Sequence, residues 1–112
     1  MKSIDPVTEE AVRRFLELIR ERYDVAGAIL YGSRARGTHG KDSDADVAVL
    51  LKGEHGKFMA VKLDMADDAF DVLLETDILI SPLPIWPDEW EHPEDSWNPV
   101  LLNNIGKEGI RL

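Results

Sequence analysis

Three short, largely apolar runs limit most strongly what this chain can fold into. They lie at 26–31 (AGAILY), 45–51 (ADVAVLL) and 77–80 (DILI), and a glycine, a Lys-Gly pair or a Ser-Pro pair follows each one. Apolar runs of this length that end at turn residues are typical of buried strands. We therefore expect the chain to build its core around a small sheet.

Longer stretches with helical spacing separate these runs. Asp5 can cap a helix over about 6–22, since a carboxylate accepts hydrogen bonds from free N–H groups and the proline that follows is tolerated in a first turn. The stretch 57–75 repeats apolar residues at steps of three and four, which predicts a second helix, and a short helix is expected over 100–105. In the second helix the pattern predicts an apolar face of Met59, Leu63, Ala66, Phe70 and Leu73, with Lys62, Asp64, Asp68 and Asp71 in solvent.

The order helix, strand, strand, helix, strand, helix indicates an α+β or α/β fold, with a small mixed sheet flanked by helices. The length of 112 residues suits a single domain over 1–112. The stretch 82–97 contains four prolines and three tryptophans, so we expect irregular backbone there that covers the sheet or a partner.

Composition and charge exclude several classes of protein. The chain has no cysteine, which excludes disulfides, thiol nucleophiles and cysteine-ligated metals. No apolar run approaches the ~20 residues of a membrane span, and no signal peptide is evident, so the expected location is the cytoplasm. The net charge of −9 lies entirely in residues 53–112, which argues against duplex nucleic acid as a direct partner.

Two aspartates at the start of the second strand form a candidate metal site. Asp44 and Asp46 are two residues apart, so they leave a strand on the same side. Two adjacent carboxylates repel each other unless a cation lies between them, and oxygen ligands of this kind suit Mg²⁺ together with substrate phosphates. The alternative is that both are ordinary surface aspartates.

A third aspartate, Asp77, is expected to join this pair. It begins the third apolar run, and a helix over 57–75 is long enough for a right-handed crossover that makes the last two strands parallel. Asp77 then arrives at the same sheet edge as Asp44 and Asp46. Three carboxylates there can hold two metal ions about 3.5–4 Å apart, as in phosphoryl or nucleotidyl transfer.

A glycine loop lies next to these carboxylates in the expected fold. Gly32 allows a phosphate to approach the backbone closely, and Ser33 adds a hydroxyl group. Arg34, Arg36 and Lys41 are nearby cations that can face phosphate oxygens. The alternative is that at least one of these arginines is only a solvated surface charge.

The pattern Gly32-Ser33, ten residues, then Asp44-Ala45-Asp46 resembles the signature of the DNA polymerase β-type nucleotidyltransferase superfamily. The longer form YGSRARG over 31–37 resembles its minimal nucleotidyltransferase (MNT) branch, and the similarity covers about 26–81. Many such domains are antitoxins encoded beside a HEPN-type ribonuclease toxin.

The resemblance implies a polymerase β-like fold and a role for each matched residue. Asp44 and Asp46 would bind two Mg²⁺ ions, and Asp77 matches the third catalytic carboxylate. The nucleoside triphosphate, with ATP as the donor, would be held by Gly32, Ser33 and Arg36.

The expected activity is Mg²⁺-dependent transfer of a nucleoside monophosphate, AMP from ATP foremost, to a hydroxyl acceptor with release of pyrophosphate. The resemblance implies that a HEPN-type toxin is the first candidate for the acceptor and partner, and that this chain is its antitoxin. Two alternatives stay open: transfer to a small molecule such as an antibiotic, and an antitoxin that acts by binding alone with a vestigial nucleotide site. The sequence also leaves open whether the chain forms a homo-oligomer.

The acidic half suggests one further hypothesis. The surface formed by residues 57–97 would dock a basic partner protein, because the net charge and the tryptophans are concentrated there. The alternative is that the charge serves solubility alone.

Overall fold

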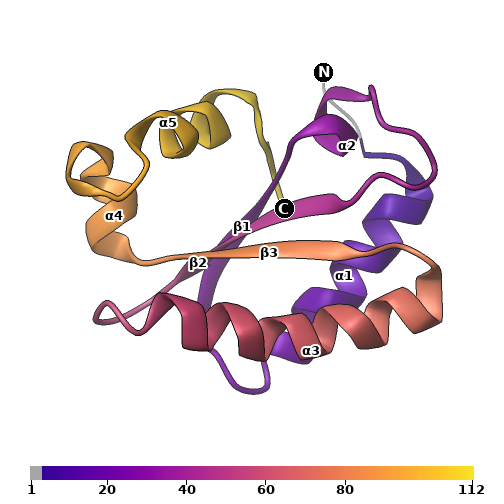
Figure 1. The fold of residues 1–112 in the computed structure, drawn as a ribbon, viewed down its shortest axis with the longest axis horizontal. Coiled ribbons are helices and arrows are strands. Elements are labelled where there is room, and N and C mark those ends of the chain that lie inside the picture. Colours follow the sequence, from indigo (N-terminus) through magenta and orange to yellow (C-terminus); the bar gives the residue numbers. More distant parts are fainter. Residues whose placement is uncertain (1–3) are drawn as a thin grey trace.

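The computed structural model describes residues 4–112 as a four-stranded sheet with helices on both faces (Figure 1). The strands are β1 (Val25–Tyr31), β2 (Ala45–Leu51), β3 (Ile80–Ile85) and β4 (Ile110–Arg111). The helices are α1 (Pro6–Ile19), α2 (Ser33–Arg36), α3 (Phe58–Thr76), α4 (Pro87–Glu91) and α5 (Pro99–Glu108), with a 3₁₀ turn η1 at Pro93–Asp95.

The sheet is mixed, as predicted. Its strand order is β3-β2-β1-β4, with β1 antiparallel to β2 and to β4. Strands β2 and β3 are parallel, and α3 connects them as the expected crossover. The predicted α+β fold with a small mixed sheet flanked by helices is therefore confirmed, while the two-residue strand β4 was not predicted.

Alternation along the strands divides the core between the two faces of the sheet. Val47 and Val49 of β2 pack with α1 and α3, whereas Ala48 and Leu50 pack on the other face with Leu102 and Ile105 of α5. Figure 1 shows α3 and α1 on one side of the sheet and α4 and α5 on the other. None of the helices within residues 4–112 is both long and apolar enough to cross a membrane.

The position of β3 differs from the prediction. The strand begins at Ile80 and includes Pro82 and Pro84, whereas a strand over 77–80 was expected. Prolines are accepted because β3 is an edge strand that pairs only with β2, so fewer of its N–H groups are needed for the sheet. Asp77 instead follows the last turn of α3 in the left-handed conformation, with φ 65°.

The buried face of α3 also differs from the prediction. Met59, Leu63 and Phe70 are exposed, and Asp68 is buried against the guanidinium group of Arg22. Helical spacing identifies residues that share a face, but packing against α1 and β3 decides which face is covered. In this helix, the residues that are buried are Met65, Asp68, Ala69 and Val72.

The stretch 82–97 is more regular than expected, because it contains most of β3, the helix α4 and the turn η1. Trp86 is buried and Trp90 is half-buried, so two of the three tryptophans belong to the core. Trp97 is exposed and meets the ring of Phe58 edge-on, with 5.7 Å between the centroids.

Candidate active site

Strand β2 presents Asp46 on the face of the sheet that α5 covers. Its neighbours Ala45 and Val47 are buried on the opposite face, so alternation directs the Asp46 carboxylate away from them. Asp44 immediately precedes the strand and is exposed. Burial raises the pKa of Asp46, and the nearby charge of Asp44 raises it further, while Arg36 acts in the opposite direction. A half-buried carboxylate beside a second one is a site that a cation would stabilise.

Gly32 lies against this carboxylate. Its φ of 75° is left-handed, and a Cβ atom at this position would lie 2.3 Å from Oδ2 of Asp46. Only glycine fits both conditions, because any larger residue would strain the turn and displace the carboxylate. The contact places the glycine loop beside Asp46, as expected, and the assignment of both to one functional site stays a prediction.

Two residues of the glycine loop, Gly32 and Arg36, line a small cavity with α5. Ser33 begins α2, directly after Gly32, and the Arg36 guanidinium lies 4.0 Å from the carboxylate of Glu108. Burial, with a contribution from the charge of Asp46, raises the pKa of Tyr31 to about 12. The cavity has a volume of about 150 Å³ and is lined by Tyr31, Gly32, Arg36, Leu101, Asn104, Ile105 and Glu108.

Arg34 has a different role from the one expected of a phosphate-facing cation. It is buried, and its guanidinium group donates hydrogen bonds to the backbone oxygens of Ser43 (2.9 Å) and Lys41 (3.2 Å). A third hydrogen bond goes to Oγ1 of Thr8 in α1, at 2.8 Å. Arg34 therefore connects α2 to the backbone of Ser43, which directly precedes the exposed Asp44. This role depends on contacts between distant segments, so sequence reasoning missed it.

Asp77 is not brought into the same cluster. It lines a separate cavity of about 400 Å³ with Asp5, Arg34, His39 and Lys41, among others. Within residues 4–112, one group of three His, Asp or Glu side chains has its ligand atoms within 4.8 Å of one another, and it does not include Asp77.

The β3 residue beside Asp46 is Ser81. Ser81 shares the face of Asp46, because Ile80 belongs to the core on the other side. The assignment of Asp77 as third metal ligand stays a prediction, and its position after α3 does not favour it.

The three-residue group consists of His55, Asp88 and Glu89, which sequence reasoning did not connect. Nδ1 of His55 lies 3.0 Å from Oδ2 of Asp88 and 3.9 Å from Oε1 of Glu89. The imidazole also stacks on Trp86, with 4.5 Å between the ring centroids. An N–H group at Nδ1 that faces the two carboxylates accounts for this geometry, and His55 follows the end of β2 that is opposite to Asp46.

Comparisons with known proteins agree with the motif. The family model described as "Nucleotidyltransferase domain" matches residues 12–94. This chain belongs to the nucleotidyltransferase domain family. The matched span contains Gly32, Ser33, Asp44 and Asp46 and ends before α5, so the family match covers the motif but not the helix that closes the cavity.

A solved structure of a "putative nucleotidyltransferase" from Sulfolobus solfataricus is similar to this nucleotidyltransferase domain at 18% sequence identity. The similarity covers 99% of this chain and 89% of that protein, with a TM-score of 0.44. No curated protein matches the sequence. Family membership therefore supports nucleotidyl transfer in general, without a specific nucleotide or acceptor.

Proposed function

We propose that this domain transfers a nucleoside monophosphate, AMP from ATP foremost, to a hydroxyl group of a partner protein. The observation that carries the proposal is the contact between Gly32 and the Asp46 carboxylate, with Asp44 beside it. It places a glycine, whose backbone a phosphate can approach closely, beside a pair of carboxylates suited to a hard cation.

The two carboxylates fit Mg²⁺, because oxygen ligands are its preferred donors, and because burial first and the charge of Asp44 second raise the pKa of Asp46, which a cation would offset. Asp44 and Asp46 would hold the ions, and Mg²⁺ in such sites neutralises phosphate charge and activates an attacking oxygen. Asp77 is kept as a candidate third ligand that would have to approach the pair.

The other residues act on the triphosphate directly. Gly32 admits a phosphate to the backbone, the hydroxyl group of Ser33 donates a hydrogen bond, and Arg36 offsets charge. In the transfer, the acceptor oxygen forms a bond to the α-phosphorus, and the bond from that phosphorus to the bridging oxygen breaks. Pyrophosphate leaves, and the hydroxyl proton is released to solvent.

The proposed acceptor is a HEPN-type toxin, with this chain as its antitoxin. The support is the resemblance of residues 31–37 to the MNT branch and the negative charge of the second half of the chain. An antitoxin that acts by binding alone is a second candidate, favoured by the separation of Asp77 from the acidic pair and by Ser81 at the neighbouring β3 position.

One labelling experiment tests the activity. The protein is incubated with Mg²⁺, ATP labelled in the α-phosphate and a purified HEPN-type partner encoded beside it. We expect label on the partner and release of pyrophosphate, both lost in Asp46→Asn. Asp42→Asn serves as a matched control, because it removes an exposed carboxylate outside the pair. Neutralisation of the partner without label would establish the binding-only candidate instead.

A further inference from the structure

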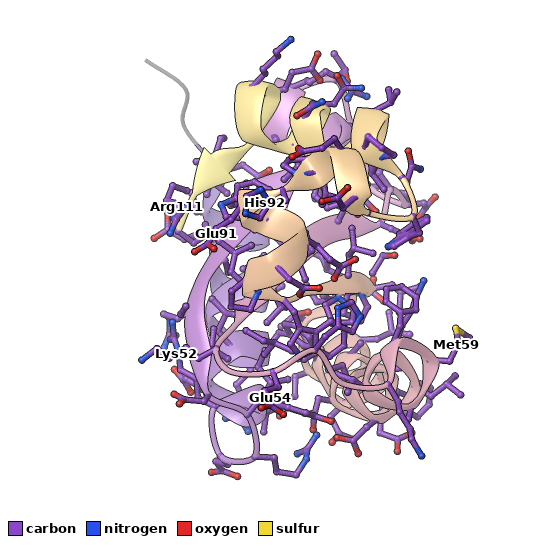
Figure 2. The ribbon with its side chains drawn as sticks, turned by 90° about the vertical axis from the view of Figure 1, so that its left-hand side faces the viewer. Lys52, Glu54, Met59, Glu91, His92 and Arg111 are labelled. Atoms are coloured by element: carbon purple, nitrogen blue, oxygen red, sulfur yellow. The ribbon has the colours of Figure 1, made fainter. Side chains whose placement is uncertain are left out.

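Helix α3 exposes a row of large apolar side chains. Met59, Leu63, Phe70 and Leu74 are 59%, 62%, 56% and 71% exposed. With the exposed Ala66 they follow steps of three and four, so they share one helix face, which we name the α3 stripe. Figure 2 shows Met59 at one end of this helix, pointing away from the body of the molecule.

This row is longer than scattered surface residues require. Single exposed apolar residues are common, but a contiguous apolar patch marks an interaction surface. From Met59 to Leu74 the stripe extends for about 22 Å at 1.5 Å per residue. That length matches four turns of a second helix packed alongside.

The charges beside the stripe indicate what kind of partner it fits. Asp67 and Asp71 are four residues apart and form an exposed acidic row next to it, and neither makes an ion pair within residues 4–112. The neighbouring carboxylates, Asp64 and Asp68, are already engaged, because both accept hydrogen bonds from the one guanidinium group of Arg22. On the other side of the stripe Lys62 is the one cation of α3, and its ammonium group lies 5.8 Å from the centroid of the Phe58 ring. Two carboxylates, Asp67 and Asp71, outnumber it, so the net charge beside the stripe is negative.

A second copy of the chain fits this face poorly. A twofold dimer brings the same surface of both subunits together, so residues near the middle of the contact meet their own copies. Asp67 adjoins Ala66 at the middle of the stripe and would face another Asp67, a juxtaposition of like charges that disfavours pairing.

We propose that the α3 stripe docks an amphipathic helix of another protein, with Lys or Arg residues beside its apolar row that face Asp67 and Asp71. The end of α3 lies close to the proposed active site. Leu79, which is exposed, follows α3, and its backbone oxygen accepts a hydrogen bond from the N–H group of Ala45, the residue between Asp44 and Asp46. The inference rests on the proposed function only in taking this partner to be the acceptor.

Synthetic helical peptides test the surface without nucleotide. One probe has four turns with a leucine row flanked by lysines, and the second replaces the lysines by glutamates. We expect fluorescence anisotropy to show tighter binding of the lysine peptide to the wild-type protein. Leu63→Ser with Phe70→Ser should weaken that binding at least about tenfold. Val100→Ser is the matched control, because it removes a 69% exposed apolar side chain from α5 and should leave binding unchanged.

Charge reversal separates docking from attraction to a generally acidic protein. Asp67→Lys with Asp71→Lys should reverse the preference, so that the glutamate peptide binds more tightly. Equal binding of both peptides to this variant, or unchanged binding after the Leu63 and Phe70 substitutions, would overturn the proposal. A wild-type dimer in sedimentation that these substitutions dissociate would assign the stripe to a second copy instead. Loss of nucleotide transfer alone would leave all these readouts intact and would count against the proposed function only.

Discussion

Replacement of Arg34 by alanine tests whether this buried cation holds the acidic loop in place. The substitution removes the three hydrogen bonds that its guanidinium group donates, two of them to backbone oxygens in the loop before Asp44. Hydrogen bonds from charged groups contribute about 1.5–3 kcal/mol each, and their losses do not add fully. We therefore expect Arg34→Ala to lower the free energy of unfolding by about 3–5 kcal/mol.

A loss of this size is large but measurable. Domains of this kind have unfolding free energies of about 5–15 kcal/mol, so the variant should still fold at low temperature. The melting temperature should fall by about 10 °C or more. Arg34→Lys should restore only part of the stability, because one ammonium group cannot reproduce the fork of donors that reaches Ser43, Lys41 and Thr8.

Arg36→Ala is the matched control in the same short helix. Arg36 is exposed and lies 4.0 Å from its carboxylate partner, so its removal should cost less than about 1 kcal/mol. Urea denaturation measures both variants, and calorimetry of Mg²⁺–ATP binding reports on the site. Arg34→Ala should bind Mg²⁺–ATP more weakly at a temperature where it is fully folded. Equal destabilisation by the two substitutions would refute the anchoring role of Arg34.

Three further predictions concern the carboxylates and the glycine loop. Without metal, Asp46→Asn should raise the free energy of unfolding at pH 7, because the raised pKa of Asp46 means that the folded state disfavours the ionised carboxyl group. Denaturation in EDTA measures this change. The stabilisation that Mg²⁺ gives the wild type should be absent in the Asp46→Asn variant. Gly32→Ala should lower stability by about 1–3 kcal/mol and abolish Mg²⁺–ATP binding in calorimetry, since its Cβ meets Asp46 at 2.3 Å and its φ is left-handed. Asp64→Asn tests the pH dependence of stability. Hydrogen bonds from Tyr23 and Arg22 hold the pKa of Asp64 in the folded state below its ordinary value of 3.8. The stabilisation that ionised Asp64 gives the fold is therefore complete above about pH 5 and is lost as the pH falls through this lowered pKa. Urea unfolding should show a wild-type advantage over Asp64→Asn at pH 7 that shrinks as the pH falls below 3.8, and an advantage that does not change with pH would contradict the assignment.

The sequence by itself determined the features that depend on local geometry. The apolar run at 45–51, closed by Lys52-Gly53, was enough to predict the buried strand β2 with the bounds that the structure shows. The residue type at Gly32 is likewise a local requirement, because its φ of 75° favours glycine, although its contact with Asp46 depends on the antiparallel pairing of β1 with β2. The extent of β2 could be predicted because neighbours in the chain decide it.

The tertiary structure decided what depends on distant segments. Parallel pairing with β2 sets the register of β3, which places Ser81 beside Asp46 and leaves Asp77 after α3. Helical spacing cannot tell which face of α3 is covered; packing of Met65, Ala69 and Val72 into the core decides it, and Arg22 pairs with Asp68 on that face. The anchoring role of Arg34 has the same origin, since its acceptors come together only when α1, α2 and the loop before β2 have packed. Register, buried face and anchor are properties of long-range packing, which local periodicity does not encode.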